Sequence, residues 1–207
     1  MFRVLSKVLT AATLLLMGNV AAQAGSGAVA QPATYAAVGP ETTVPYGWVD
    51  FCRRYVGECE HEPVAPLDIN LSAKALTDID RVNKWVNASI EPVSDMDHWG
   101  VADQWDYPTD KKGDCEDYAL LKRRLLIGLG FPRQALLMTV VKDEHNEGHA
   151  ILTLKTNRGE FVLDNLNNSV RPWNETGYRF VKRQSQTDEN VWVQIGEPTA
   201  APALVSR

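Results

Sequence analysis

Hydrophobic residues recur with a helical spacing in the middle of the chain. Between residues 72 and 89 the apolar positions are three or four residues apart and comprise Leu76, Ile79, Val82 and Val86. Side chains at these separations are neighbours on one face of an α-helix. The pattern therefore predicts an amphipathic helix from about Ser72 to Ser89.

A second helix is predicted to begin within the stretch GDCEDYALL, residues 113–121. Asp114 is a favourable N-cap residue, and Asp117 follows at the third helical position, where an acidic side chain can reach back as in a capping box. A largely apolar run follows at Ala119, Leu120, Leu125, Leu126 and Leu129. Gly130, followed by Phe131 and Pro132, is a typical signal of a helix C-terminus.

Beyond residue 134 the pattern changes to short β-branched and apolar runs separated by turn residues. The predicted strands cover residues 135–142, 149–156, 160–165, 178–183 and 191–196. Residues 157–159, Asn-Arg-Gly, are typical of the turn of a hairpin. Helices that precede a run of antiparallel strands indicate an α+β fold, with N-terminal helices packed on an antiparallel sheet.

The N-terminus has the layout of a secretory signal peptide. Residues 1–24 carry Arg3 and Lys7, then an apolar stretch, then the small-residue sequence Ala-Gln-Ala before a predicted cleavage after Ala24. An uncleaved membrane anchor is the alternative, although the apolar run is short for a spanning helix. We therefore expect an exported, periplasmic protein.

The rest of the chain suits one domain of ordinary size, since it has 207 residues and no visible repeat. Residues 25–45 and 197–207 are rich in small residues and proline, and we expect a flexible mature N-terminus and a flexible tail around a domain at 46–196. Cleavage would leave 19 basic against 26 acidic residues, a net charge of −7 in place of −5. This charge gives no indication of a nucleic-acid partner.

Export changes the interpretation of the three cysteines, because thiols of exported proteins tend to be paired. Cys52 and Cys59 are close enough in sequence to close a small disulfide loop, which leaves Cys115 as a reactive or intermolecular thiol. Two alternatives remain at this point. All three cysteines could be reduced and buried, or Cys52, Cys59 and His61 could bind a metal ion, although a fourth ligand is not evident.

Cys115 is the candidate nucleophile. It would lie in the first turn of the second helix, where unpaired N–H groups and the helix dipole favour a thiolate. A nucleophilic cysteine also needs a base and a group that orients the base. His149 begins one predicted strand and Asp164 ends the next, and the hairpin that joins these strands would bring the two side chains together.

GDCEDYALLKRRLL, followed by GHAILTL and EFVLDNL, resembles the bacterial transglutaminase-like cysteine proteinase family, which includes LapG-type periplasmic proteases that release biofilm adhesins. The resemblance extends from about Tyr46 to Ile195. It implies a papain-like, transglutaminase-core fold. It also implies that Cys115 is the nucleophile, His149 the general base and acid, and Asp164 the residue that orients His149.

The resemblance further implies bound calcium, with Asp114 and Glu116 as ligands and Asp117 as a plausible third. Carboxylate oxygens suit a hard cation, which would offset the negative charge around Cys115. The alternative is that these acids only cap the helix. An oxyanion would need donors, for which we consider the backbone N–H of Cys115 and the indole N–H of Trp105, with Trp99 as a substitute.

Three functions are compatible with these residues. The first is a cysteine endopeptidase, a monomer that cleaves a cell-surface protein such as an adhesin and is held by an inner-membrane receptor. The second is a transglutaminase or amide acyltransferase that uses the same thioester, with an amine as acceptor. The third is a calcium-dependent binding module without catalysis, which the competent residues at all three triad positions disfavour.

Overall fold

The computed structural model describes residues 34–196. The signal peptide predicted at 1–24 and the tail predicted at 197–207 lie outside these residues. Within the described part, one sheet contains seven strands, antiparallel at every pairing. Their spatial order is β1 (Val38–Thr42), β9 (Trp192–Ile195), β8 (Arg179–Gln184), β4 (Leu136–Lys142), β5 (Gly148–Thr156), β6 (Gly159–Asp164) and β7 (Asn167–Pro172).

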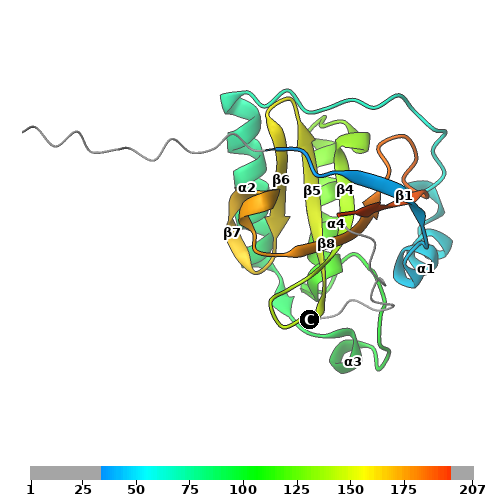
Figure 1. Ribbon diagram of the computed structural model, residues 1–207. Helices are drawn as coiled ribbons and strands as arrows, with labels where there is room; N and C mark the ends of the chain where they lie inside the picture. The colour runs from blue at the N-terminus through cyan, green and yellow to red at the C-terminus, as the bar shows by residue number, and fades with distance from the viewer. Residues whose placement is uncertain (1–33, 197–207) are drawn as a thin grey trace, which may run out of the picture. The chain divides into compact units, whose positions relative to one another are not determined.

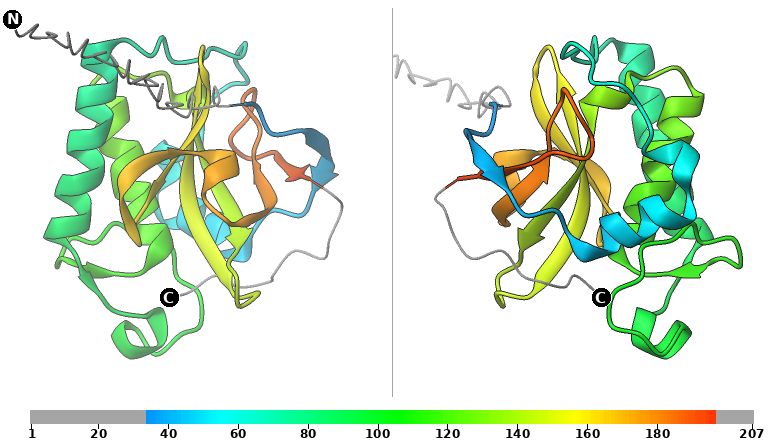
Figure 2. Two further views of the ribbon diagram at one scale, coloured as in Figure 1. Left: turned by 60° about the vertical axis from the view of Figure 1, so that its left-hand side comes forward. Right: turned by 90° about the vertical axis from the view of Figure 1, so that its right-hand side faces the viewer.

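Three longer helices cover one face of this sheet (Figures 1 and 2). They are α1 (Tyr46–Arg54), α2 (Ala73–Ser89) and α4 (Cys115–Gly128). Helix α4 packs on β4, β5 and β6, and α2 packs on α4 and β7. The predicted α+β class, with helices on an antiparallel sheet, is confirmed.

Shorter elements connect the main ones. The described residues also form η1 (Val56–Glu58), β2 (Glu91–Pro92), α3 (Asp95–His98), β3 (Lys112–Gly113), η2 (Arg133–Ala135) and η3 (Trp173–Glu175). Strands β2 and β3 pair in parallel as a small separate sheet. This pairing brings the segment that leads into α3 beside the segment that leads into α4.

Both faces of the central strands are buried. Leu152 and Leu154 of β5 contribute to the main core between sheet and helices, whereas Ile151, just before them, packs into a second cluster on the opposite face. Burial of a leucine or isoleucine side chain contributes about 1.5–3 kcal/mol to folding. Strands buried on two faces lose the alternation of polar and apolar residues, which explains the continuous apolar runs in the sequence.

The helix limits agree closely with the sequence patterns. The Ser72 hydroxyl accepts a hydrogen bond from the Ala75 N–H and caps α2, as expected. Gly130 adopts a φ of +88°, which favours glycine, just beyond the end of α4. Two expected core positions are wrong, since Leu76 is 44% exposed and Leu129 is 49% exposed.

The capping box predicted for α4 is not formed. Asp114 is the N-cap residue, but its side chain makes no capping hydrogen bond and accepts instead from the Asp95 N–H at 3.3 Å. Asp117 accepts from the Asp106 N–H at 2.7 Å. The two carboxylates are therefore directed at the start of α3 and at the loop between α3 and α4.

Strands β1 and β7 and helix α1 were not predicted as elements. Strand β1 lies in the segment 25–45, for which we expect flexibility, yet it pairs with β9 and places residues 38–42 at one edge of the sheet. Strand β7, with the sequence NNSVRP, forms the other edge. Edge strands carry fewer buried residues, so they give a weaker sequence signal.

Cys52 and Cys59 form a disulfide with a Cα–Cα distance of 5.6 Å, as predicted, and Cys115 is free. The two alternatives are thereby wrong: the cysteines are not all reduced, and Cys52 and Cys59 are not metal ligands with His61. Instead His61 Nδ1 lies 2.7 Å from Glu189 Oε1. No helix among residues 34–196 has the length and apolar character needed to span a membrane.

Candidate active site

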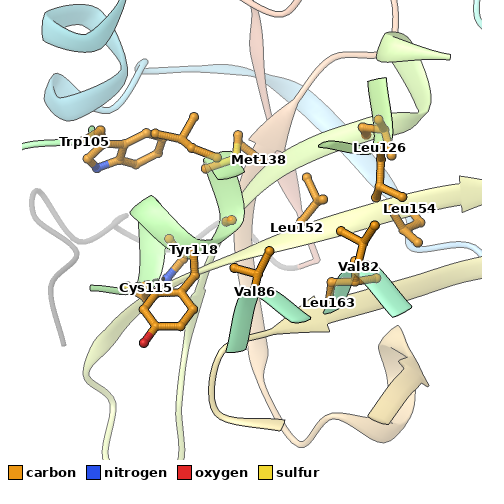
Figure 3. Close-up of a cluster of buried hydrophobic side chains, with 14 of the residues drawn as sticks. Val82, Val86, Trp105, Cys115, Tyr118, Leu126, Met138, Leu152, Leu154 and Leu163 are labelled. Carbon is orange, nitrogen blue, oxygen red and sulfur yellow. Dashed lines mark hydrogen bonds between the residues drawn. The ribbon is translucent and has the colours of Figure 1, made fainter. Parts of the chain in front are cut away.

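The start of α4 places Cys115 between the helix layer and the sheet. Its side chain is 1% exposed and borders the main apolar cluster beside Tyr118 (Figure 3). The approach to this helix needs a glycine at position 113, because a Cβ there would lie 2.5 Å from Asp117 Oδ2. Within the GDC sequence, Gly113 is therefore required by the close packing of Asp117, and Cys115 is the candidate nucleophile.

His149 and Asp164 come from adjacent strands, as the sequence predicts. His149 Nε2 and Asp164 Oδ1 are 2.9 Å apart, and both side chains are buried. The hairpin register pairs Leu152 with Leu163, which brings the start of β5 beside the end of β6. The hydrogen bond at Nε2 leaves Nδ1 of His149 as the nitrogen available for other chemistry.

The same strand start contacts the sulfur of Cys115. The Ala150 N–H donates to Cys115 Sγ at 3.3 Å, so the thiol lies against the residue that follows His149. His149 Nδ1 is buried, and no hydrogen-bond partner for it is found among residues 34–196. The structure therefore brings all three predicted residues into one buried region.

In this structure the thiol of Cys115 is directed at the neighbouring carboxylate of Glu116. It donates to Glu116 Oε2 at 3.0 Å. Burial raises the pKa of Cys115 well above its ordinary value, and the charges of Glu116 and Asp114 raise it further. In this arrangement the thiol is protonated, and a change in the charge of the neighbouring acids is needed before it can act as a nucleophile.

These acids are part of a larger group, which we term the acid cluster: Asp95, Asp103, Asp114, Glu116 and Asp117. Oxygens of Asp95, Asp103 and Glu116 lie within 4.8 Å of one another, and so do oxygens of Asp95, Asp114 and Asp117. All three acids predicted from sequence are present. Asp95 and Asp103 were missed, because they come from α3 and the loop after it.

The acid cluster is electrostatically unfavourable as a set of carboxylates. Burial raises the pKa of Asp114 to about 7, with a further contribution from Asp95. The pKa values of Glu116 and Asp117 are raised well above their ordinary values by burial and then by neighbouring acids, chiefly Asp114. Burial also raises the pKa of Asp95. Close acids without cations cannot all ionise.

The cluster has the donor set of a hard-cation site. Asp95 Oδ1, Asp114 Oδ1 and Glu116 Oε1 are buried, and within the described part of the chain no N–H or O–H group reaches them. Buried carboxylate oxygens normally have donors or metal ions as partners. Several oxygens within a few ångströms of one another are the ligands that calcium prefers. The residues present therefore fit a calcium ion.

Trp105 does not have the free donor that we expected for an oxyanion. Its indole N–H donates to Asp103 Oδ1 at 2.9 Å, and its side chain is fully buried. The ring also fills the space above Gly47, where a Cβ would lie 2.2 Å from Trp105 Cδ1. Trp105 therefore packs in the core and holds a member of the acid cluster. Trp99 is 47% exposed and stacks on His98.

Two further residues near Asp164 were not identified from the sequence. The Tyr178 hydroxyl donates to Asp164 Oδ2 at 2.6 Å. Lys122 of α4 is fully buried, and among residues 34–196 its Nζ has no hydrogen-bond partner. Burial lowers the pKa of Lys122 to about 7, while the charge of Asp164 opposes this shift. Lys122 could have been identified from sequence as a lysine within a leucine-rich helix.

A family model described as bacterial transglutaminase-like cysteine proteinase matches residues 38–200. This chain belongs to that family. It is accordingly a cysteine peptidase of the transglutaminase-like type, and the expected transglutaminase-type core is confirmed. Among curated proteins, none matches the chain.

Solved structures of Legionella pneumophila LapG are also similar to this chain. One is 24% identical with a TM-score of 0.49, and the match covers 57% of this chain and 68% of LapG. A calcium-bound form is 23% identical with a TM-score of 0.48, and its match covers 61% of this chain and 74% of that one. An EGTA-treated form is 23% identical with a TM-score of 0.48, and its match covers 59% of this chain and 71% of that one.

Proposed function

We propose that this protein is an exported, calcium-dependent endopeptidase in which Cys115, His149 and Asp164 form the catalytic triad. The observation that carries the proposal is the pairing of His149 Nε2 with Asp164 Oδ1 at 2.9 Å beside the buried sulfur. This hydrogen bond leaves His149 Nδ1 without a partner among the described residues. The N–H of the next residue, Ala150, donates to Cys115 Sγ. These are the relations that a nucleophile, its base and an orienting group require.

The proposed reaction is an acyl transfer through a thioester. His149 Nδ1 accepts the proton of Cys115, and the sulfur attacks the carbonyl carbon of the substrate peptide bond. The carbon–nitrogen bond breaks as His149 returns the proton to the leaving amine. Water, deprotonated by His149, then attacks the thioester, which releases the acid product and regenerates the thiol.

Asp164 has two functions in this scheme. It holds the ring so that Nε2 carries a hydrogen and Nδ1 can accept a proton, and its charge stabilises the imidazolium that forms. The pKa of Asp164 is lowered: burial acts against ionisation, but the hydrogen bond and charge of His149, then the Tyr178 hydroxyl, outweigh it. Asp164 is thus ionised at neutral pH, as this role requires.

Calcium would be held by the acid cluster, and when bound it supplies positive charge that offsets the carboxylates. Glu116 could then direct its oxygens away from the thiol, which frees the proton of Cys115 for His149. Asp114, as N-cap residue, would link the cation site directly to the start of α4. The support for this part is the set of buried carboxylate oxygens that no donor in residues 34–196 reaches.

We further propose a periplasmic location after cleavage of residues 1–24, a cell-surface protein such as a biofilm adhesin as substrate, and an inner-membrane receptor as regulator of the monomer. The disulfide between Cys52 and Cys59 fits an oxidising compartment. The substrate and the receptor follow from family resemblance alone. They are therefore the first subjects for experiment.

The test is incubation of residues 25–207 with surface proteins encoded near the gene, with Ca²⁺ or with excess EGTA. We expect cleavage that needs Ca²⁺ and is lost in Cys115→Ala and His149→Ala. His145→Ala is the matched control, because His145 lies in the turn before β5 and its side chain is 70% exposed. Full cleavage by His149→Ala, or in excess EGTA, contradicts the triad or the calcium dependence respectively.

Mass spectrometry of the products separates hydrolysis from the second candidate reaction. Hydrolysis gives two shorter chains whose masses include one added water. A transglutaminase or acyltransferase instead gives a product that carries the mass of an added amine, because the amine takes the place of water at the thioester. We expect hydrolysis products when no amine is supplied.

A further inference from the structure

Tyr178 follows Gly177, whose φ of +79° turns the chain into β8. The tyrosine hydroxyl donates to Asp164 Oδ2 at 2.6 Å. Its ring packs edge-on against the His149 imidazole, with centroids 5.4 Å apart and an interplanar angle of 60°. One side chain thus contacts both members of the pair that is proposed to activate the thiol.

The hydrogen bonds of Asp164 are divided between its two oxygens. Oδ1 accepts from His149 Nε2 at 2.9 Å and from the Leu166 N–H at 3.0 Å. In the described part of the chain, Tyr178 is the donor that reaches Oδ2. The carboxylate is 2% exposed, so loss of this donor would leave a buried charged oxygen without a compensating hydrogen bond.

We propose that Tyr178 is a positioning residue, whose hydroxyl fixes the Asp164 carboxylate in the plane that holds His149. This inference rests on the catalytic triad proposed above. It adds a fourth residue, which acts through its contacts with Asp164 and His149. The edge-on contact with the imidazole also limits rotation of the His149 ring.

The charges around Asp164 come from several elements. His149 donates from β5, and Lys122 faces Asp164 from α4 with an electrostatic interaction but no hydrogen bond. Tyr178 in turn interacts electrostatically with Arg171 of β7 and with Cys115. Asn87 of α2 donates to the Asp164 backbone carbonyl, not to the carboxylate. Removal of the Tyr178 hydroxyl therefore changes one hydrogen bond and leaves these charges in place.

The variant Tyr178→Phe removes the hydroxyl and keeps the ring that packs on His149. The side-chain carboxyl of Asp164 is followed by ¹³C NMR in aspartate-labelled protein and assigned through Asp164→Asn. We expect Asp164 to titrate about one pH unit higher in Tyr178→Phe, because a donor to the carboxylate is lost. We also expect kcat to fall about tenfold while KM stays within about twofold, since positioning affects the reaction more than substrate binding.

The matched control is Tyr35→Phe. The Tyr35 hydroxyl donates to the Thr156 carbonyl at 2.7 Å, at the far end of β5 from His149, and its loss should leave the Asp164 titration unchanged. The inference is overturned if Asp164 titrates in Tyr178→Phe as in the wild type. Failure of the triad itself is a separate result, because it would appear as full turnover by His149→Ala whatever Tyr178→Phe does.

Discussion

A single carboxylate, that of Asp164, and the acid cluster are both buried near the free cysteine, and they have opposite surroundings. Asp164 accepts hydrogen bonds from an imidazole, a backbone N–H and a phenol, and its pKa is lowered. The acid cluster is equally buried, but its members face one another, and the pKa of Asp114 rises to about 7. Burial alone therefore does not determine the charge of an acid here; the donors and the charges around it also do.

The comparison assigns different tasks to the two groups. Asp164 is complete without any added ion, which suits a residue that must stay charged and fixed through a reaction cycle. The acid cluster is incomplete as protein alone, which suits a site that becomes stable when a cation binds. The cysteine lies between them, and its thiol contacts Glu116 of the cluster.

The largest expected effect comes from Asp164→Asn. Loss of the charge that supports the imidazolium should lower kcat about a thousandfold or more. If the two groups are independent, calcium affinity measured by titration calorimetry should be unchanged. A parallel loss of calcium binding would break the division between them.

Asp95→Asn tests the other side of the comparison and should have an intermediate effect. With one buried ligand charge removed, calcium affinity should fall at least about tenfold. The calcium-free protein should become more stable by about 1 kcal/mol, because a buried charge without a full set of donors is replaced by an amide. Calorimetry and thermal unfolding in EGTA measure the two changes.

Asp97→Asn is the control for this prediction, since Asp97 lies on the same short helix and is exposed. It should change neither calcium affinity nor the stability of the calcium-free protein. Equal behaviour of Asp95→Asn and Asp97→Asn would mean that the cluster does not bind the cation.

Lys122→Met replaces a buried amine by an uncharged side chain of similar length, and its expected effect is on the pH dependence of stability. Burial lowers the pKa of Lys122 from its ordinary 10.5 to about 7 in the folded protein. Between these values the unfolded chain binds the proton and the folded protein does not, so wild-type stability rises as the pH increases from about 7 to 10. The methionine variant should lack this rise in denaturant unfolding at a series of pH values. Identical slopes would show that Lys122 is paired in solution.

Much of the fold was predictable because its central elements follow simple periodic rules. Ser72 and Gly130 mark helix limits through capping and a positive φ, and the central strands are continuous apolar runs. The two sheet edges were not predictable in the same way. Strand β1 contains glycine and proline, and β7 is largely polar, so both resemble loops in sequence.

The candidate site was predictable where its residues adjoin regular elements. Cys115, His149 and Asp164 mark a helix start, a strand start and a strand end, so local patterns indicated their meeting point. Asp95 and Tyr178 reach the site from a short helix and a turn distant in sequence. No local periodicity relates such residues to the others, and only the tertiary packing of the loops brings them together.

The disulfide has a consequence for when the enzyme can become active. The Cys59 carbonyl accepts from Asn190, whose amide oxygen accepts from Trp48, and Trp48 packs against Trp105. Trp105 in turn holds Asp103 of the acid cluster. The disulfide between Cys52 and Cys59 thus anchors a chain of contacts that ends at Asp103 of the acid cluster. A chain in a reducing compartment would lack that disulfide, so under the export proposed above we expect activity to appear only after export.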